Sequence, residues 1–138
     1  MKKLVIIPTY NEKENIRDII SAIFSLGQDF HILVVDDSSP DGTAEIVKAM
    51  QSEFPHHLHL STRKVKDGLG KAYIHGFWWA LQNNYDYIFE MDADFSHNPD
   101  DLLRLYEACC NGSDVAIGSR YVKGVNVVNW PLPRILLS

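Results

Sequence analysis

The sequence predicts one α/β domain in which a mostly parallel sheet carries helices on both faces. Short apolar runs rich in β-branched residues alternate with segments of helical periodicity along most of the chain. The 138 residues are 46% hydrophobic and 22% charged, which is typical of a globular domain that buries about two-thirds of its unfolded surface. The sequence contains no repeat, linker or low-complexity stretch that would divide it.

Five strands are expected. Two are apolar, β-branched runs buried on both faces, one is indicated by alternation of apolar and polar residues, and two are further apolar runs. The five strands are residues 4–7, 32–35, 58–61, 87–91 and 115–117.

Four helices are expected between these strands. Asn11 and Glu14 have the spacing of a capping box ahead of apolar residues at helical intervals, and Gly27 is expected to end that helix. The other expected helices are residues 43–53, 72–81 and a segment that starts at Pro99 with Asn98 as its N-cap.

Composition excludes several classes of protein. The formal net charge of −5 provides no overall field that would favour nucleic acid. No run of 18 apolar residues is present, and the N-terminal apolar run is too short for a signal peptide, so we expect a cytosolic chain. Cys109 and Cys110 are adjacent, and we expect them to be reduced thiols.

Polar side chains follow the expected strands where each one ends. Ligands of open parallel sheets bind beyond the carboxyl ends of the strands, so these side chains are expected along one rim. The rim residues are Pro8, Tyr10, Glu12, Asp36, Asp37, Asp41, Asp92, Asp94, Ser96, His97 and Arg120. Crowded carboxylates are costly unless a cation or a hydrogen-bonding ligand relieves them.

Asp92 and Asp94 are the most specific feature of this rim. Residues two apart in an extended segment point to the same side, so both carboxylates can converge on one point. Hard oxygen ligands suit Mg²⁺ or Mn²⁺ bridging a diphosphate. The alternative, a turn that caps the next helix, is less favoured because Asn98 and Pro99 already supply that start.

Residues 36–43 leave two interpretations open. The segment is a well-formed turn and helix start, or one of its aspartates accepts hydrogen bonds from a nucleobase or ribose. Tyr10 is suited to stacking on a base, and Glu12 either binds a ribose hydroxyl or occupies a first helical turn. Residues 67–71 have a glycine-bearing pattern but lack the spacing of a Walker phosphate loop.

Three histidines, His56, His57 and His59, raise the question of a metal site. No cysteine or other ligand type stands at zinc spacing from them, so we expect a solvated loop. The Trp78–Trp79 pair is expected to place one ring in the core and one at the surface.

Five blocks of the sequence, in this order, resemble glycosyltransferase family 2, which has the GT-A fold. They are residues 7–12, 36–43, 68–76, 91–97 and 118–121. All but the first resemble more narrowly the dolichol- or polyprenol-phosphate mannosyltransferases. The resemblance implies that residues 1–138 form a nucleotide-sugar-binding catalytic domain shortened at its C-terminal end. It implies inverting transfer of mannose from GDP-mannose to a polyprenyl or dolichyl phosphate, assisted by Mg²⁺ or Mn²⁺.

The resemblance also implies roles for individual residues. Asp94 and Arg120 would be catalytic, and Asp92, Asp94 and Ser96 would hold the metal. The donor and its diphosphate would contact Pro8, Tyr10, Glu12, Val35, Asp37, Asp92, Ala93, Asp94, Arg120 and Arg134. A phosphate acceptor is already ionised at neutral pH, so no general base is required.

Alternatives remain open at this stage. The donor can be another nucleotide sugar of the UDP-glucose type, the acceptor can differ, or the chain can bind nucleotide without transferring sugar. A haloacid-dehalogenase phosphatase would need Asp92-x-Asp94-x-Ser96 after its first strand, and a dehydrogenase would need a glycine-rich loop there. Apolar residues 128–137, with Trp130, suit either a peripheral contact at the cytoplasmic face of a membrane or internal packing.

Overall fold

A computed structural model describes residues 2–64, 68–112, 115–118 and 125–128, the last two segments as backbone only. The chain forms two compact units, Met1–His97 and Asn98–Ser138, and each is described by itself.

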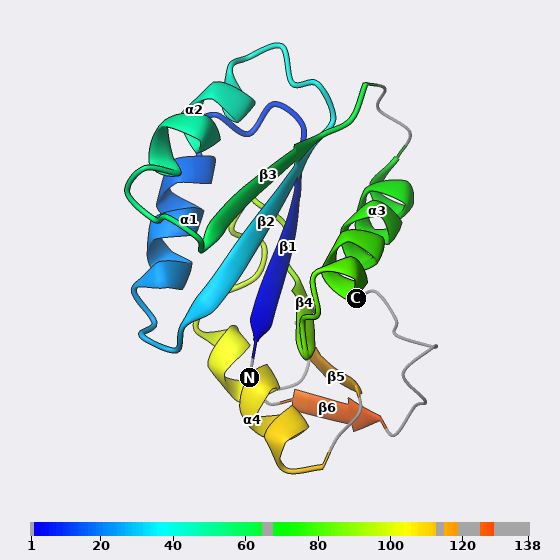
Figure 1. The fold of residues 1–138 in the computed structure, drawn as a ribbon. Coiled ribbons are helices and arrows are strands. Elements are labelled where there is room, and N and C mark those ends of the chain that lie inside the picture. The colour runs from blue at the N-terminus through cyan, green and yellow to red at the C-terminus, as the bar shows by residue number, and fades with distance from the viewer. Residues whose placement is uncertain (1, 65–67, 113–114, 119–124, 129–138) are drawn as a thin grey trace. The chain divides into compact units, whose positions relative to one another are not determined.

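A parallel sheet of four strands forms the centre of the first unit (Figure 1). Its order is β3-β2-β1-β4, and every neighbouring pair is parallel. The central strand β1 therefore pairs with both β2 and β4, and the predicted parallel sheet is confirmed for these four strands. Their bounds are β1 Lys3–Thr9, β2 Phe30–Asp36, β3 Leu58–Thr62 and β4 Tyr87–Glu90.

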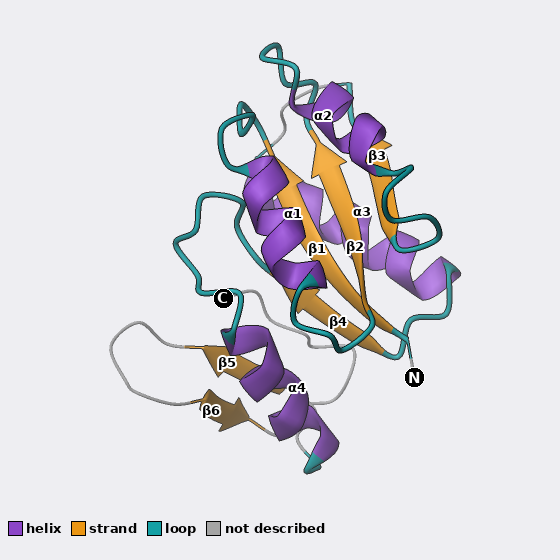
Figure 2. Cartoon of the chain, turned by 90° about the vertical axis from the view of Figure 1, so that its left-hand side faces the viewer, coloured by secondary structure: helices purple, strands orange, loops and turns teal. Residues whose placement is uncertain are grey.

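Helices cover both faces of this sheet, as the sequence predicts. Helices α1 (Ile16–Phe24) and α2 (Thr43–Met50) pack together on one face, and α3 (Leu69–Gln82) lies on the other (Figure 2). The outer surface of α3 exposes Trp78, whereas Trp79 stacks on Tyr85, which confirms the expected division of the tryptophan pair.

The core of the first unit follows from the alternation of side chains along the strands. Leu4 and Ile6 of β1 pack with Tyr73 and Ala80 of α3, whereas their neighbours in the strand turn to the face of α1 and α2. Gly76 permits a close approach between α3 and β1, because a Cβ at this position would lie 2.7 Å from Ile6 Cγ2. This contact fixes α3, and with it Tyr73, against the sheet.

The predicted capping box at Asn11 is wrong. Helix α1 begins at Ile16 after Asn15, whose side chain makes no capping hydrogen bond, and Asn11 has a φ of 56°. The backbone N–H of Asn11 instead donates to Ser39 Oγ (2.9 Å), and that of Glu12 donates to Thr43 Oγ1 (3.1 Å). The loop after β2 therefore satisfies these donors, which a local pattern does not show.

Other helix bounds differ from the sequence pattern by a few residues. Helix α2 ends at Met50, whose carbonyl then accepts the N–H groups of Glu53 and Phe54 in turns, and α3 begins at Leu69 and includes Gly70. Gly27 has a φ of 74° after α1, as expected for a helix stop.

The second unit contains α4 (Asp101–Cys110), β5 (Val115–Gly118) and β6 (Val125–Val128). Pro99 is not the first helical residue, because Asn98 Oδ1 accepts the N–H of Asp100 and forms a turn ahead of α4. The expected fifth strand exists, but it is not part of the parallel sheet: β5 pairs with β6 in an antiparallel pair.

Two further findings concern the part of the chain that the structure describes. Cys109 and Cys110 form no disulfide, as expected. Over the same residues, no helix has the length and apolar character needed to cross a membrane.

Candidate functional site

The rim residues lie at the carboxyl ends of three adjacent strands. The end of β1, followed by Tyr10 and Glu12, lies between the end of β2, followed by Asp37, and the end of β4, followed by Asp92. From β1 the chain adds β2 and β3 on one side and then returns to add β4 on the other side of β1. Open parallel sheets bind ligands at such a switch point in strand order. Adjacent strands are about 4.8 Å apart, so the ends of β2 and β4 stand about 10 Å apart across β1.

Asp36 builds the loop rather than a binding site. Its side chain is buried, and Oδ1 accepts hydrogen bonds from Thr9 Oγ1 (2.7 Å) and Ser39 Oγ (2.6 Å). Oδ2 accepts the N–H of Ser39 at 3.0 Å. The interpretation of residues 36–43 as a formed turn therefore holds for this residue.

Asp41 likewise belongs to the turn that starts α2. Oδ1 accepts the N–H of Thr43 (3.0 Å) and its hydroxyl (2.5 Å), and Oδ2 accepts the N–H of Lys13 (3.1 Å). The bond to Lys13 joins the loop after β1 to the loop after β2.

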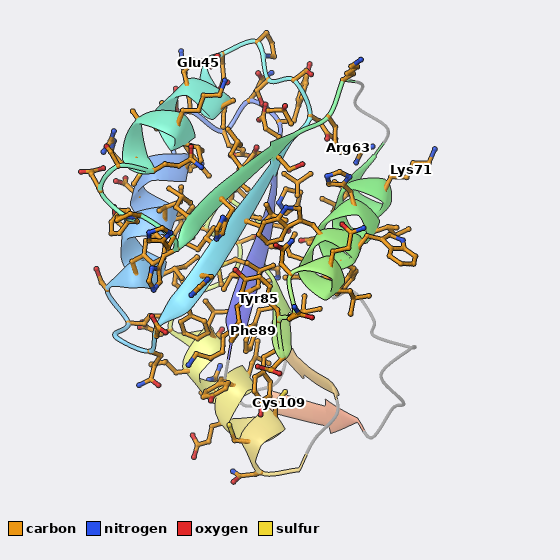
Figure 3. The ribbon with its side chains drawn as sticks, in the orientation of Figure 1. Glu45, Arg63, Lys71, Tyr85, Phe89 and Cys109 are labelled. Atoms are coloured by element: carbon orange, nitrogen blue, oxygen red, sulfur yellow. The ribbon has the colours of Figure 1, made fainter. Side chains whose placement is uncertain are left out.

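Asp37 differs from these two aspartates, because its carboxylate faces a cation. The side chains of Asp37 and Arg63 are 7% and 13% exposed, and Asp37 Oδ1 lies 3.5 Å from Arg63 Nε. The backbone N–H of Asp37 donates to the carbonyl of Thr9. Figure 3 shows Arg63 and Lys71 at this end of the first unit, beyond β3 and on the first turn of α3. No motif in the sequence marks Arg63, because its partner lies on another strand.

Asp92 and Asp94 follow β4, and each has a distinct local partner. The hydroxyl of Tyr73 donates to Asp92 Oδ1 at 3.0 Å, and the N–H of Ser96 donates to Asp94 Oδ1 at 2.9 Å. Hydrogen bonding by the side chain and the backbone of Ser96 lowers the pKa of Asp94, so this exposed carboxylate stays ionised. Burial, followed by the charge of Asp92, raises the pKa of Tyr73, which therefore remains a donor.

The rim carries a concentrated negative charge. Burial raises the pKa of Glu12, and the charges of Asp94, Asp41 and Asp92 raise it further, against the effect of a hydrogen bond from Asn15. These carboxylates therefore repel one another, a repulsion that a bound cation would relieve.

Glu90, the last residue of β4, is a further carboxyl group next to this charge. Both of its carboxylate oxygens are buried without a hydrogen bond, and burial together with the charge of Asp92 raises its pKa to about 8. His97, three residues after Asp94, also has a buried Nδ1 without a hydrogen-bond partner. Asp92 and Asp94 offer hard oxygen ligands among carboxylates that repel one another. These two residues therefore fit a divalent cation such as Mg²⁺ or Mn²⁺.

The remaining predicted site residues divide into two groups. Pro8 and Tyr10 are partly exposed at the rim, whereas Val35 and Ala93 have buried side chains, so that only their backbone is available to a ligand. Arg120 and Arg134 lie outside the described residues, and their roles stay predictions.

This fold and rim define a class of protein. The sequence profile of glycosyl transferase family 2 matches residues 4–137, and the chain belongs to this family. The parallel sheet and its helices are those of a GT-A glycosyltransferase.

Two named relatives are similar to this chain over nearly its whole length. The chain is 49% identical to the polyprenol monophosphomannose synthase of Mycolicibacterium smegmatis, over 99% of this chain and 52% of that protein. It is 46% identical to the undecaprenyl-phosphate mannosyltransferase of Micrococcus luteus, over 100% of this chain and 56% of that protein. The chain thus spans little more than half the length of these relatives.

A solved structure with the same fold comes from Pyrobaculum calidifontis. It is a mannosyltransferase in complex with GDP-Man and Mn²⁺, 28% identical to this chain, with a TM-score of 0.60. The match covers 67% of this chain and 27% of the solved one.

Proposed function

We propose that this chain supplies the donor-binding part of a glycosyltransferase that moves mannose from GDP-mannose to a polyprenyl phosphate, with inversion at the sugar. The observation that carries this proposal is the pair Asp92 and Asp94, held at the end of β4 beside Glu12 and across β1 from Asp37. The names of the two relatives, and the GDP-Man and Mn²⁺ in the Pyrobaculum structure, support the choice of donor and acceptor.

The proposed binding mode follows the order of the strands. The nucleoside lies at the ends of β2 and β1, where it contacts Asp37, Tyr10, Glu12 and the backbone at Val35. The diphosphate then extends toward β4, where Asp92 and Asp94, with Ser96 beside them, would hold a divalent cation. The span of about 10 Å between the ends of β2 and β4 suits a nucleoside diphosphate that crosses β1. Pro8 and Ala93 line this path, and Arg120 and Arg134 are proposed to face phosphate or sugar.

The proposed reaction requires little proton transfer by the protein. The bond between C1 of mannose and the diphosphate oxygen breaks while an oxygen of the acceptor phosphate attacks C1 from the opposite side. The acceptor oxygen is already ionised, and the departing GDP carries the developing charge. Asp92 and Asp94 would hold a divalent cation there, which would supply positive charge to offset this negative charge. Asp94 stays ionised and Tyr73 orients Asp92, so both carboxylate groups are in position before GDP-mannose binds.

A polyprenyl phosphate is a membrane lipid, so we propose that the reaction takes place at a membrane surface. Binding of the donor and transfer of the sugar are separable steps, because transfer requires both reactants in attack geometry.

The test separates these two steps. Calorimetric titration of the chain with GDP-mannose, UDP-glucose and GDP, each with Mn²⁺, with Mg²⁺ and with EDTA, should show tightest binding for GDP-mannose with a divalent ion. A preference for UDP-glucose would overturn the proposed donor, and binding indifferent to EDTA would overturn the metal assignment. Radiolabelled mannose transfer to a short-chain polyprenyl phosphate then tests the acceptor, with the same lipid without phosphate as its control.

A further inference from the structure

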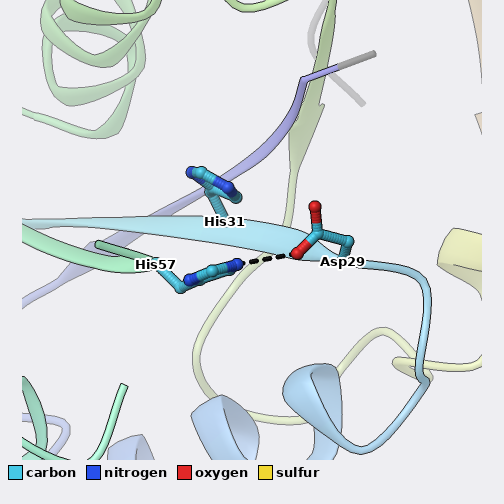
Figure 4. Close-up of side chains that lie close together, drawn as sticks. All are labelled: Asp29, His31 and His57. Carbon is cyan, nitrogen blue, oxygen red and sulfur yellow. Dashed lines mark hydrogen bonds and ion pairs between the residues drawn. The ribbon is translucent and has the colours of Figure 1, made fainter. Parts of the chain in front are cut away.

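Three potential metal-ligating groups meet at the opposite end of the sheet from the rim. Asp29 precedes β2, His31 lies in β2, and His57 precedes β3 (Figure 4). One nitrogen of each imidazole and one oxygen of the carboxylate all lie within 4.8 Å of one another. His31 and Asp37 lie six residues apart along β2, or about 20 Å at the rise of an extended strand. The cluster is therefore separate from the proposed donor site.

The hydrogen bonds of His57 define the character of this cluster. Its Nε2 lies 2.7 Å from Asp29 Oδ1, and its Nδ1 lies 3.1 Å from the carbonyl oxygen of Pro55. A neutral imidazole has one N–H and can donate to only one of these acceptors. Both contacts are satisfied when the ring carries a second proton, and these hydrogen bonds to Pro55 and Asp29 raise the pKa of His57. A metal ion on Nε2 would replace the proton that points at Asp29 and would widen the 2.7 Å separation. A proton and a metal ion therefore compete for the same position.

Supporting contacts hold both imidazoles in the way that metal-ligating histidines are usually held. The Pro55 carbonyl engages Nδ1 of His57 and leaves Nε2 directed at Asp29. The Tyr85 hydroxyl bonds Nδ1 of His31 at 2.8 Å, and the centroids of the two imidazole rings are 4.4 Å apart. A partner on the second ring nitrogen fixes the orientation and raises the basicity of a ligating histidine.

The groups around the cluster carry charges of both signs, and the carboxylate of Asp29 is the negative one among the three proposed ligands. Burial lowers the pKa of His31, and the positive neighbours His57, His59 and Lys2 lower it further, so its imidazole is neutral near pH 7. The hydrogen bond from His57 lowers the pKa of Asp29, which therefore remains ionised. Lys3 also contributes positive charge near Asp29. The carboxylate offsets part of the charge of an incoming ion.

The cluster also has room for a further ligand. A cavity of about 310 Å³ lies beside it, lined by Asp29 and His57 together with the rings of Phe24 and Phe54. A water molecule in this space would complete a four-coordinate set. Two imidazole nitrogens, one carboxylate oxygen and one water form a donor set that suits Zn²⁺.

We propose that Asp29, His31 and His57 form a second metal site, which binds a zinc-type divalent ion and ties the start of β2 to the segment before β3. The site differs in chemistry from the oxygen donors of Asp92 and Asp94, and it does not depend on the proposed transferase activity. It also reverses the expectation of a solvated loop at residues 56–59. That expectation considered ligands near in sequence, whereas Asp29 and His31 come from the neighbouring strand.

The experiment uses protein without a histidine tag and Co²⁺ as a spectroscopic stand-in for Zn²⁺. Wild-type protein should give visible d–d absorption with Co²⁺, which Zn²⁺ displaces, and Zn²⁺ should raise its Tm. His57→Gln and His31→Gln should each weaken Zn²⁺ binding by at least tenfold. Tyr85→Phe keeps every ligand and the aromatic core, and it should weaken binding about tenfold through loss of the supporting hydrogen bond.

Two controls make the result specific. His75→Gln alters a histidine that bonds Ser61 outside the cluster, and it should bind Zn²⁺ like the wild type. Asp18→Asn, at an exposed carboxylate of α1 outside both proposed metal sites, should do the same. The proposal fails if the wild type shows neither Co²⁺ absorption nor a Zn²⁺-dependent Tm. It also fails if the His57→Gln variant binds Zn²⁺ as tightly as the His75→Gln variant.

Discussion

The hydroxyl of Tyr73, on the inner face of α3, donates a 3.0 Å hydrogen bond to Oδ1 of Asp92 at the end of β4. This bond links the packing of the core to the proposed metal ligands. Tyr73 is only 2% exposed, and the close approach of α3 to β1 at Gly76 fixes its helix. Tyr73 is therefore a positioning residue for Asp92.

Removing this hydroxyl should affect binding that depends on the metal. We expect Tyr73→Phe to weaken Mn²⁺-dependent binding of GDP-mannose about three- to tenfold, a cost of about 1 kcal/mol for one lost hydrogen bond. Calorimetric titration with Mn²⁺ measures this effect, and binding of GDP in EDTA should not change. An equal loss with and without metal would indicate a general structural defect instead.

Asp94→Asn should have a larger effect. The change keeps the shape of the side chain but removes a charged oxygen ligand, so metal-dependent GDP-mannose binding should weaken more than tenfold, or by more than about 1.4 kcal/mol. Stability should fall only slightly, because Ser96 favours the ionised carboxylate in the folded protein but the side chain is exposed and the amide oxygen of Asn can still accept the N–H of Ser96. Asp18→Asn, an exposed change on α1, is the matched control. Equal Mn²⁺ dependence in the two variants would remove Asp94 from the metal site.

The sequence predicts those features that depend on neighbouring residues in the chain. The strands follow from runs such as Leu4–Ile7, and the carboxylate pair follows from the spacing of Asp92 and Asp94. The start of α1 did not follow, because Ser39 and Thr43, from a distant loop, bond the donors that a capping box would satisfy.

The rest of the site depends on contacts between distant parts of the chain. Tyr73 and Asp92 are separated by 19 residues, and His57 and Asp29 by 28. The ion pair of Asp37 and Arg63 likewise joins the ends of two strands. No local pattern marks such pairs. For the same reason, the run at 115–117 predicted a strand but not its antiparallel partner.

Asp37→Ala tests the nucleoside end of the proposed site. If Asp37 accepts hydrogen bonds from base or ribose, the variant should lose affinity for GDP and GDP-mannose to the same extent, with and without Mn²⁺. Stability should also fall by about 1–3 kcal/mol, because the largely buried Arg63 loses its ion pair with Asp37. Urea unfolding measures this cost separately from binding.

Asp37→Asn provides the second arm of this test. The amide oxygen preserves an acceptor while the charge is lost, so binding should be less impaired than in Asp37→Ala. Loss confined to GDP-mannose, with GDP binding intact, would place Asp37 near the sugar and contradict the nucleoside assignment.

The raised pKa of Glu90 predicts how the stability of the first unit depends on pH. The folded pKa of Glu90, about 8, lies above the ordinary value of 4.5, because burial and the charge of Asp92 disfavour the charged form. The folded protein therefore binds the proton more tightly than the unfolded chain, and stability falls as the pH rises from 4.5 through 8.

Glu90→Gln removes this penalty of a buried charge, so in urea unfolding with EDTA the variant should exceed wild-type stability at pH values above 8. The expected gain is on the order of a few kcal/mol, reduced by the partial exposure of the residue. The gain should nearly vanish at about pH 5, where the wild-type side chain is protonated in the folded state. Glu45→Gln, at an exposed glutamate of α2 labelled in Figure 3, should match the wild type throughout. A gain that is the same at both ends of the pH range would show that the substitution acts through packing and not through a buried charge.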